Sequence, residues 1–356
     1  MTSSTKGIKF SEIIKTLNQN YPLSLAEKWD NVGVLVENSD SSEKMIENVF
    51  LTIDLTEPVL QEAIDKKSDF IITYHPPLFA SFKQVTQKSA SQRIATKAIE
   101  NKIPIYSPHS ILDSVENGMN DWIAKGLLKM TEGKGQVRPI QPVQDSVNTS
   151  SKYSHKLTVY TQIDKEQKLV SSMTLNVLTN FVEYGKIEYG LQSSQISETT
   201  EKLSGELKDF IVGWELKPFV EKLSSSEKGA GRFVTLSKEV TIEEAVKCVK
   251  SLFNMEYIRL AKPLDGKTKG IKTISLCAGS GGMLIFNEKA DLYLTGELKH
   301  HEILDANAKG SYVIVCDHSN SERGYLPEYK SALSTLFKDK LNFTISTLDK
   351  DPLSIV

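Results

Sequence analysis

The most informative part of this chain is Tyr312-Val-Ile-Val-Cys-Asp-His-Ser-Asn-Ser-Glu-Arg-Gly324. It opens with a β-branched run that indicates a buried strand, and it then turns polar before a segment with a helical pattern. His318 and Glu322 are four residues apart, so a helix that begins near residue 319 would place both side chains on one face. Ligands of open α/β sheets bind at the carboxyl ends of strands. An imidazole and a carboxylate at such a place indicate a metal site, although this spacing is also typical of a surface ion pair.

Strands and helices alternate on both sides of this stretch. A polar turn leads into a short strand within residues 28–37, and the other predicted strands of the core are residues 49–55, 69–74, 103–106, 232–236, 271–278, 291–295, 312–315 and 343–348. The predicted helices are residues 8–17, 58–67, 90–101, 116–127, 241–253 and 298–308. This alternation indicates βαβ units with right-handed crossovers. The predicted fold class is therefore α/β, with mostly parallel strands and flanking helices.

The middle of the chain interrupts this alternation. Residues 131–153 are rich in Gly, Gln, Ser, Asn and Lys without an apolar period, which indicates a linker. A chain of 356 residues suits two domains, or one discontinuous domain with an insertion. We expect an N-terminal half of the core in residues 1–135, an inserted α+β domain with linkers in residues 136–230, and a C-terminal half in residues 231–356.

The composition is that of an ordinary soluble globular protein, with 39% hydrophobic residues, 25% charged residues and a net charge of −2. The absence of a basic run argues against nucleic-acid binding. Cys248, Cys277 and Cys316 lie in apolar patterns without a CxxC pair, which favours a reducing compartment over a disulfide framework. The first residues lack the apolar segment of a signal peptide, and no run of eighteen apolar residues occurs. We expect no membrane association and a cytoplasmic location, with the nucleus as the alternative.

Two further histidines follow predicted strands. His75 lies directly before Pro76 and Pro77, which stiffen the loop, so its ring could be a ligand, a general base or the cap of a turn. His109 and Asp113 follow the strand at residues 103–106 and repeat the spacing of four residues. Because parallel neighbours bring their carboxyl ends to one edge of a sheet, we expect these side chains to lie close together.

The collected candidates are nitrogen and oxygen donors without a thiolate: His75, His109, Asp113, His318 and Glu322. Such a set is typical of a catalytic Zn, Mn or Fe centre. Five donors exceed the need of one tetrahedral ion, and two ions about 3.5–4 Å apart would use them better, bridged by a carboxylate such as Glu322.

Two other features have weaker functional interpretations. His300 and His301 are adjacent, so at most one could face the same site, as an outer partner or a substrate contact; a surface histidine is the simpler interpretation. The glycines of residues 279–282 could cradle a phosphate, or they could form an ordinary turn.

Taken together, the motifs resemble those of the NIF-three-like family, also described as the GTP cyclohydrolase I type 2 family. They occur in family order and are Trp29-Asp-Asn-Val-Gly33, Asp54-Leu-Thr56, Tyr74-His-Pro-Pro77, Ser107-Pro-His-Ser-Ile-Leu-Asp113, Cys277-Ala-Gly-Ser-Gly-Gly282, Thr295-Gly-Glu297 and Asp317-His-Ser-Asn-Ser-Glu-Arg-Gly324. The resemblance implies a two-lobed α/β fold, a dinuclear metal centre and a homohexamer built as a trimer of dimers. Longer bacterial members of the family carry a ferredoxin-like middle domain, to which residues 155–192 are only loosely similar.

The resemblance further implies roles for single residues. His75, Asp113, His318 and Glu322 match the family's metal ligands, and His109 lies beside them as a candidate proton shuttle. Bacterial members often have His-His where this chain has Tyr74 and His75, which indicates a eukaryotic-type member. A neutral tyrosine is a poor metal ligand, so one of the two ions is expected to bind weakly or to be replaced by water.

Two functions follow as hypotheses. The first is a hydrolase that uses two divalent ions and acts on nucleotides or phosphoesters, with no residue that selects GTP. The second is a non-catalytic metal-binding homo-oligomer that interacts with transcription-related protein partners. A third, a ring-shaped nucleic-acid clamp, is disfavoured by the net charge.

Overall fold

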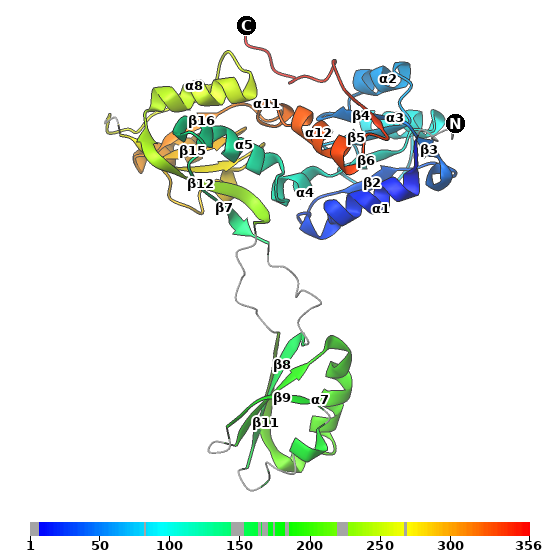
Figure 1. The fold of residues 1–356 in the computed structure, drawn as a ribbon, viewed down its shortest axis with the longest axis vertical. Helices are drawn as coiled ribbons and strands as arrows, with labels where there is room; N and C mark the ends of the chain where they lie inside the picture. Colours follow the sequence, from blue (N-terminus) through cyan, green and yellow to red (C-terminus); the bar gives the residue numbers. More distant parts are fainter. Residues whose placement is uncertain are drawn as a thin grey trace. The chain divides into compact units, whose positions relative to one another are not determined.

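The computed structural model describes residues 7–81, 83–143, 153–162, 165, 170–173, 175–181, 185–218, 227–266 and 269–356. The chain divides into two compact units, one formed by residues 1–143 and 227–356 and the other by residues 144–226 (Figure 1). The first unit contains all five candidate metal ligands.

The first sheet of the larger unit has five strands in the order β17-β4-β5-β6-β2. They are β2 (Gly33–Val36), β4 (Asn48–Thr52), β5 (Phe70–Thr73), β6 (Ile105–Ser107) and β17 (Asn342–Ile345). The pairs from β17 to β6 are parallel, and β2 pairs antiparallel with β6. The helices of this half are α1 (Phe10–Asn20), α2 (Glu57–Asp65), α3 (Ala90–Glu100), α4 (His109–Ser114) and α5 (Met119–Leu128), and a short pair joins β1 (Ile8–Lys9) to β3 (Met45–Ile46). Because β17 comes from the end of the chain, both halves of the sequence build this sheet.

The second sheet has six strands in the order β13-β16-β15-β14-β12-β7. They are β7 (Gly135–Pro142), β12 (Gly229–Val240), β13 (Arg259–Ala261), β14 (Ile271–Cys277), β15 (Leu292–Thr295) and β16 (Tyr312–Val315). Its helices are α8 (Ile242–Phe253), α9 (Gly282–Ile285), α10 (His300–Ala308), α11 (Asn320–Arg323) and α12 (Leu326–Leu336). Parallel pairing is confined to β14, β15 and β16, and the flanking strands are antiparallel. The α/β fold class is confirmed.

The central strands are buried on both faces, which explains their uninterrupted apolar sequence. In β16, Tyr312 and Ile314 point into a core that both sheets share, while Val313 and Val315 point into a second core on the other face. The strands β4 and β5 alternate in the same way between the shared core and a third cluster under α2 and α3. Helix α12 packs on β4 and β17 and contributes to the shared core (Figure 1). The two sheets are therefore held together by one apolar layer.

Two local predictions differ from the structure. Residues 135–142, predicted as part of a linker, form the edge strand β7, in which only Pro139 and Ile140 are buried. An exposed edge strand shows no apolar alternation, and its pairing with β12 comes from backbone hydrogen bonds that the pattern does not reveal. The helix predicted over residues 116–127 is α5, which begins at Met119, and the helical segment after His318 is divided into α11 and α12.

The smaller unit has a four-stranded antiparallel sheet in the order β11-β8-β10-β9. Its elements are β8 (His155–Thr161), β9 (Asn176–Phe181), β10 (Lys186–Leu191), α7 (Ile196–Ser204) and β11 (Ile211–Pro218). Leu203 of α7 joins Leu157, Ile187 and Tyr189 of the sheet in one apolar cluster, and Figure 1 shows the helix beside the strands. This strand order is consistent with the split βαβ arrangement of ferredoxin-like domains.

Cys248, Cys277 and Cys316 are all free. Within the described ranges, the structure contains no helix with both the length and the apolar character needed to cross a bilayer.

The carboxylate of Glu62 ties the segment that follows β17 to helix α2. It accepts hydrogen bonds from the Ser346 hydroxyl (2.5 Å), from the Thr347 amide (2.9 Å) and hydroxyl (2.6 Å), and from the Lys66 ammonium (2.6 Å). Burial by itself raises the pKa of Glu62, but these donors outweigh it and hold the pKa far below its ordinary value of 4.5. The bonds thus favour the ionised, folded state.

Replacing Glu62 by glutamine is expected to lower the free energy of unfolding at neutral pH by about 1.5–3 kcal/mol, because hydrogen bonds to a charged group are lost. Since the folded-state pKa is depressed, this stabilisation is fully present above pH 4.5 and is lost as the pH falls further. Urea unfolding of both proteins across this pH range measures the effect. Glu57→Gln, which changes a half-exposed carboxylate of the same helix that pairs with Arg93, is the matched control and should have a smaller effect, because ion pairs near the surface contribute little. A difference between wild type and Glu62→Gln that grows in acid would contradict the assignment.

Candidate metal centre

His75 is held at the carboxyl end of β5 by its neighbours on both sides. Its amide donates to the carbonyl of Ile53, and Pro76 and Pro77 prevent the loop from continuing as a helix. Its Nδ1 lies 2.9 Å from Asp54 Oδ1 at the end of the neighbouring strand β4. Burial by itself lowers the pKa of His75, but Asp54 and Glu322 outweigh this and raise the pKa to about 10. Because Nδ1 faces Asp54, Nε2 points to the opposite side.

His318 and Glu322 lie on the turn from β16 into α11. Asp317 has a left-handed backbone (φ 61°) that turns the chain sharply, and α11 begins two residues after His318. His318 Nε2 then lies 3.4 Å from Glu322 Oε1, and Glu322 is 1% exposed. The spacing of four residues thus brings the two side chains together, and the pair is not a surface ion pair.

His75, His318 and Glu322 converge from different sheets. His75 Nε2 lies 3.4 Å from Glu322 Oε2, and the rings of His75 and His318 are 5.2 Å apart between centroids. One donor atom of each residue lies within 4.8 Å of the others. The sequence predicts that the strands that carry these residues are neighbours in one sheet. Instead, β5 belongs to the five-stranded sheet and β16 to the six-stranded sheet. The shared apolar core brings the two carboxyl ends face to face.

Two observations show that the donor set fits a cation. Glu322 Oε2 is buried and makes no well-formed hydrogen bond among the described residues, with His75 Nε2 at 3.4 Å. A buried carboxylate of this kind is costly unless a positive charge balances it. Gly279 passes so close that a Cβ there would lie 2.6 Å from Glu322 Oε1 and 3.1 Å from His318 Nε2. Because residue 279 has no side chain, the space beside both donors stays free. Two imidazoles and one carboxylate are accepted by Zn, Mn and Fe.

His109 and Asp113 lie beside this set but have other partners. The ring of His109 is 5.3 Å from that of His75, and its Nδ1 lies 2.7 Å from Asp30 Oδ1. Asp113 accepts a hydrogen bond from the Tyr74 hydroxyl at 2.7 Å. Burial raises the pKa of Asp113 to about 6, although His109 and Tyr74 favour its ionised form. Asp113 is not part of the three-residue donor group.

Neither His300 and His301 nor the glycines of residues 279–282 belong to the donor group. His300 and His301 are exposed on α10 with their rings 5.4 Å apart, as expected of surface histidines. Gly279 has φ 63°, and its amide already donates to the hydroxyl of Ser321 at 2.8 Å. The glycine run therefore turns the chain closely around the donor set.

Our interpretation of the sequence gave no role to three carboxylates that orient the rings. Asp54, Asp30 and Glu297 face the Nδ1 atoms of His75, His109 and His318, the last at 3.2 Å. Carboxylates in this position fix the ring and its tautomer so that Nε2 can bind an ion. Each lies in one of the quoted motifs, but the sequence does not show which histidine it would meet.

Replacing Asp54 by asparagine is expected to lower metal affinity about 10- to 100-fold, because the ring of His75 loses the partner that orients it. Competition with a chromophoric chelator measures the affinity. Asp317→Asn is the matched control, since Asp317 also adjoins a histidine in sequence but pairs with the exposed Arg259. Equal affinities of Asp54→Asn and wild type would contradict the role of Asp54.

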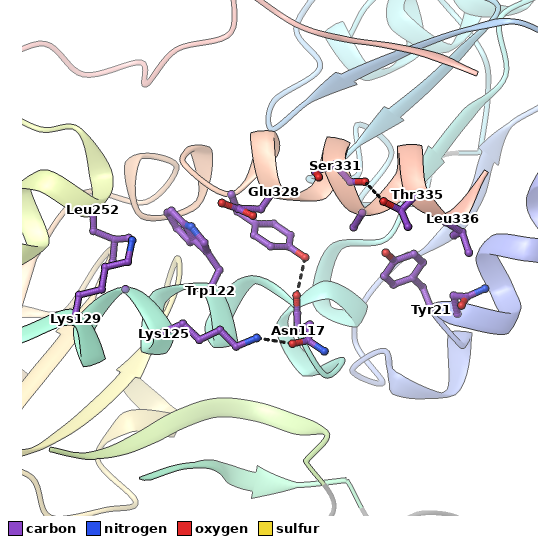
Figure 2. A pocket seen from close by; sticks show the side chains of 14 residues that line it. Tyr21, Asn117, Trp122, Lys125, Lys129, Leu252, Glu328, Ser331, Thr335 and Leu336 are labelled. Atoms are coloured by element: carbon purple, nitrogen blue, oxygen red, sulfur yellow. Dashed lines mark hydrogen bonds between the residues drawn. The ribbon is translucent and has the colours of Figure 1, made fainter. Parts of the chain in front are cut away.

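A groove of about 660 Å³ lies elsewhere on the same unit, between α5 and α12 (Figure 2). Trp122, Lys125 and Lys129 line one side of it, and Glu328 and Thr335 line the other. None of the five candidate ligands lines this groove. Its side chains do not form a donor group of the kind found at His75.

The fold and the site define an α/β protein of two sheets with a candidate divalent-metal centre between their strand ends. The family model described as Duf34/NIF3 (NGG1p interacting factor 3) matches residues 8–352, and the chain belongs to this family. This confirms the resemblance seen in the sequence motifs.

Comparisons with single proteins agree with this assignment. NIF3-like protein 1 of Dictyostelium discoideum is 51% identical over all of both chains. NGG1-interacting factor 3 of Saccharomyces cerevisiae is 28% identical, again over all of both chains. A crystal structure of a Staphylococcus aureus protein has a TM-score of 0.70 at 23% identity and covers 99% of this chain and 100% of its own, a likeness of fold.

Proposed function

We propose that the protein is a divalent-metal-dependent hydrolase that acts on nucleotides or phosphoesters. The observation that supports this most is the convergence of His75, His318 and Glu322 from two sheets around a space that Gly279 leaves free. A mixed nitrogen and oxygen set with few protein donors leaves positions for a substrate or water, as in catalytic rather than structural centres.

When bound, a divalent ion in this set supplies Lewis-acid polarisation of a phosphoryl or carbonyl oxygen and activation of water. A second ion, which the resemblance implies, would draw on Asp113 and on an oxygen of Glu322. The described residues contain no feature that selects GTP over other nucleotides.

His109 is the residue we assign to proton transfer. Asp30 holds its Nδ1 at 2.7 Å and also accepts from the amide of Ser110 at 3.1 Å, so the carboxylate is fixed to the backbone. This arrangement places the proton of a neutral ring on Nδ1 and leaves Nε2 free to accept one. The ring centroids of His75 and His109 are 5.3 Å apart, so His109 lies beside the donor set.

The test is an activity screen of the purified chain loaded with Mn, Fe or Zn against nucleotides and phosphoesters. We expect turnover that is lost in His318→Ala and retained in His300→Ala, which removes an exposed histidine. Turnover that survives His318→Ala would separate the activity from this site.

The second candidate is a non-catalytic, metal-binding homo-oligomer with protein partners in the cytoplasm or nucleus. The name of the yeast relative, an interacting factor, favours it. It predicts bound metal and a stable assembly, a hexamer by the family resemblance, without turnover on any substrate. Light scattering beside metal analysis and the activity screen distinguishes the two candidates.

A further inference from the structure

The two acids near the histidines are engaged in opposite ways. Glu322 Oε2 lies 3.4 Å from His75 Nε2, and Glu322 Oε1 lies 3.4 Å from His318 Nε2. Oε2 makes no well-formed hydrogen bond among the described groups. Asp113 instead accepts the Tyr74 hydroxyl at 2.7 Å, and Tyr74 is only 4% exposed. Glu322 is therefore available to a cation, whereas one oxygen of Asp113 is already used.

The contact between Tyr74 and Asp113 is supported from both sides. The backbone carbonyl of Asp113 accepts from the Asn120 side chain at 3.0 Å, and Asn120 in turn accepts from the amide of Ala278 at 2.9 Å. The Tyr74 amide donates to the carbonyl of Thr52 at 2.9 Å, and its own carbonyl accepts from the Ser107 hydroxyl at 2.7 Å. The backbones of both residues are thus anchored to neighbouring strands and loops, which places the two side chains beside each other.

A second ion would need more donors than this arrangement offers. A neutral tyrosine hydroxyl is a hydrogen-bond donor and a weak ligand, and here its proton is given to Asp113. Catalytic centres of this type use about three protein donors for each ion. Beyond the set formed by His75, His318 and Glu322, the nearby residues are His109, Asp113 and one shared oxygen of Glu322. Among the described residues, these do not form a second group of three donor atoms within 4.8 Å of one another.

We propose that Tyr74 limits the centre to one tightly bound ion, because it supplies no metal donor of its own and also occupies one oxygen of Asp113. The residue at position 74 then decides the metal stoichiometry of the protein. This inference rests on the metal centre of the proposed function and is independent of its hydrolytic activity.

The experiment counts Mn²⁺ in the full chain. Wild type, Tyr74→His and Tyr74→Phe are loaded with Mn²⁺, dialysed and analysed by mass spectrometry of the metal and by electron paramagnetic resonance. We expect one ion per chain and the signal of an isolated ion in wild type. Tyr74→His should hold two ions with the signal of a coupled pair, because an imidazole adds the missing donor. Tyr74→Phe is the matched control, which removes the hydroxyl without adding a donor and should hold one ion.

Two results would overturn the inference: two tightly held ions in wild type, or a single ion in Tyr74→His. The ion retained by Tyr74→His shows that this variant is folded, so a missing second ion cannot be blamed on misfolding. One ion without turnover on any substrate would contradict the hydrolase and support the role of Tyr74. Two ions in wild type together with turnover would contradict the role of Tyr74 and support the hydrolase.

Discussion

Glu322→Gln is expected to lower metal affinity about 1000-fold, the largest effect of any single change in the centre. The carboxylate is buried and lies within 3.4 Å of Nε2 of both His75 and His318, so it provides the only negative charge of the three-residue set. A unit charge about 4 Å from a cation contributes about 4 kcal/mol at the effective dielectric constant of a protein, which corresponds to about three decades of affinity. Glutamine keeps the shape of the side chain and removes the charge.

Titration of Mn²⁺ against a competing chelator measures this loss. Glu328→Gln, an exposed residue of the next helix, is the matched control and should bind as wild type does. The thermal midpoint provides a second measurement, since bound metal should raise it in wild type and not in Glu322→Gln. An affinity within tenfold of wild type would place the ion elsewhere.

Arg232→Met is expected to have the largest effect on stability, about 3–5 kcal/mol, because it leaves a partly buried carboxylate without its charge partner. Arg232 is 1% exposed and donates to both carboxylate oxygens of Asp121 on α5 and to the carbonyl of Gly231 at 2.8 Å. The side chain therefore connects the start of β12 to α5. Urea unfolding followed by circular dichroism measures the change.

Arg138→Met is the matched control for the loss of an arginine. Arg138 pairs with Glu288 at 2.8 Å on the surface, with half of its side chain exposed, so its loss should cost less than about 1 kcal/mol. The double variant Asp121→Asn with Arg232→Met should be more stable than Arg232→Met alone, because no charge is left unpaired. If the double variant is less stable instead, the pair does not act through charge.

The apolar patterns predicted the strands that carry the site. Residues 69–74 and 312–315 correspond to β5 and β16, whose side chains are buried on both faces and are therefore apolar without interruption. The edge strand β7 was not predicted, because most of its side chains are exposed and its place depends on pairing with β12. A residue pattern reports burial, and it reports pairing only where pairing and burial coincide.

The site could be predicted only in part, because some of its residues are close in sequence and others meet only through packing. His318 and Glu322 are close in sequence, so the helical spacing alone places them together. His75 joins them only because two sheets share a core, and its partners Asp54 and Glu322 are 21 and 247 residues away. The contact of Tyr74 with Asp113 also depends on how α4 packs beside β5, which the motifs do not show.

The α/β class, the family and the kind of donors that follow the strands could be inferred from the residue order, because burial and local spacing are visible in it. Which donors can share one ion depends on the folded chain: His75, His318 and Glu322 lie together, while Asp113 accepts a hydrogen bond from Tyr74. The physical reason is that distances between remote segments are set by the packing of two sheets on a common core, and a difference of a few ångströms there separates a ligand from a neighbour.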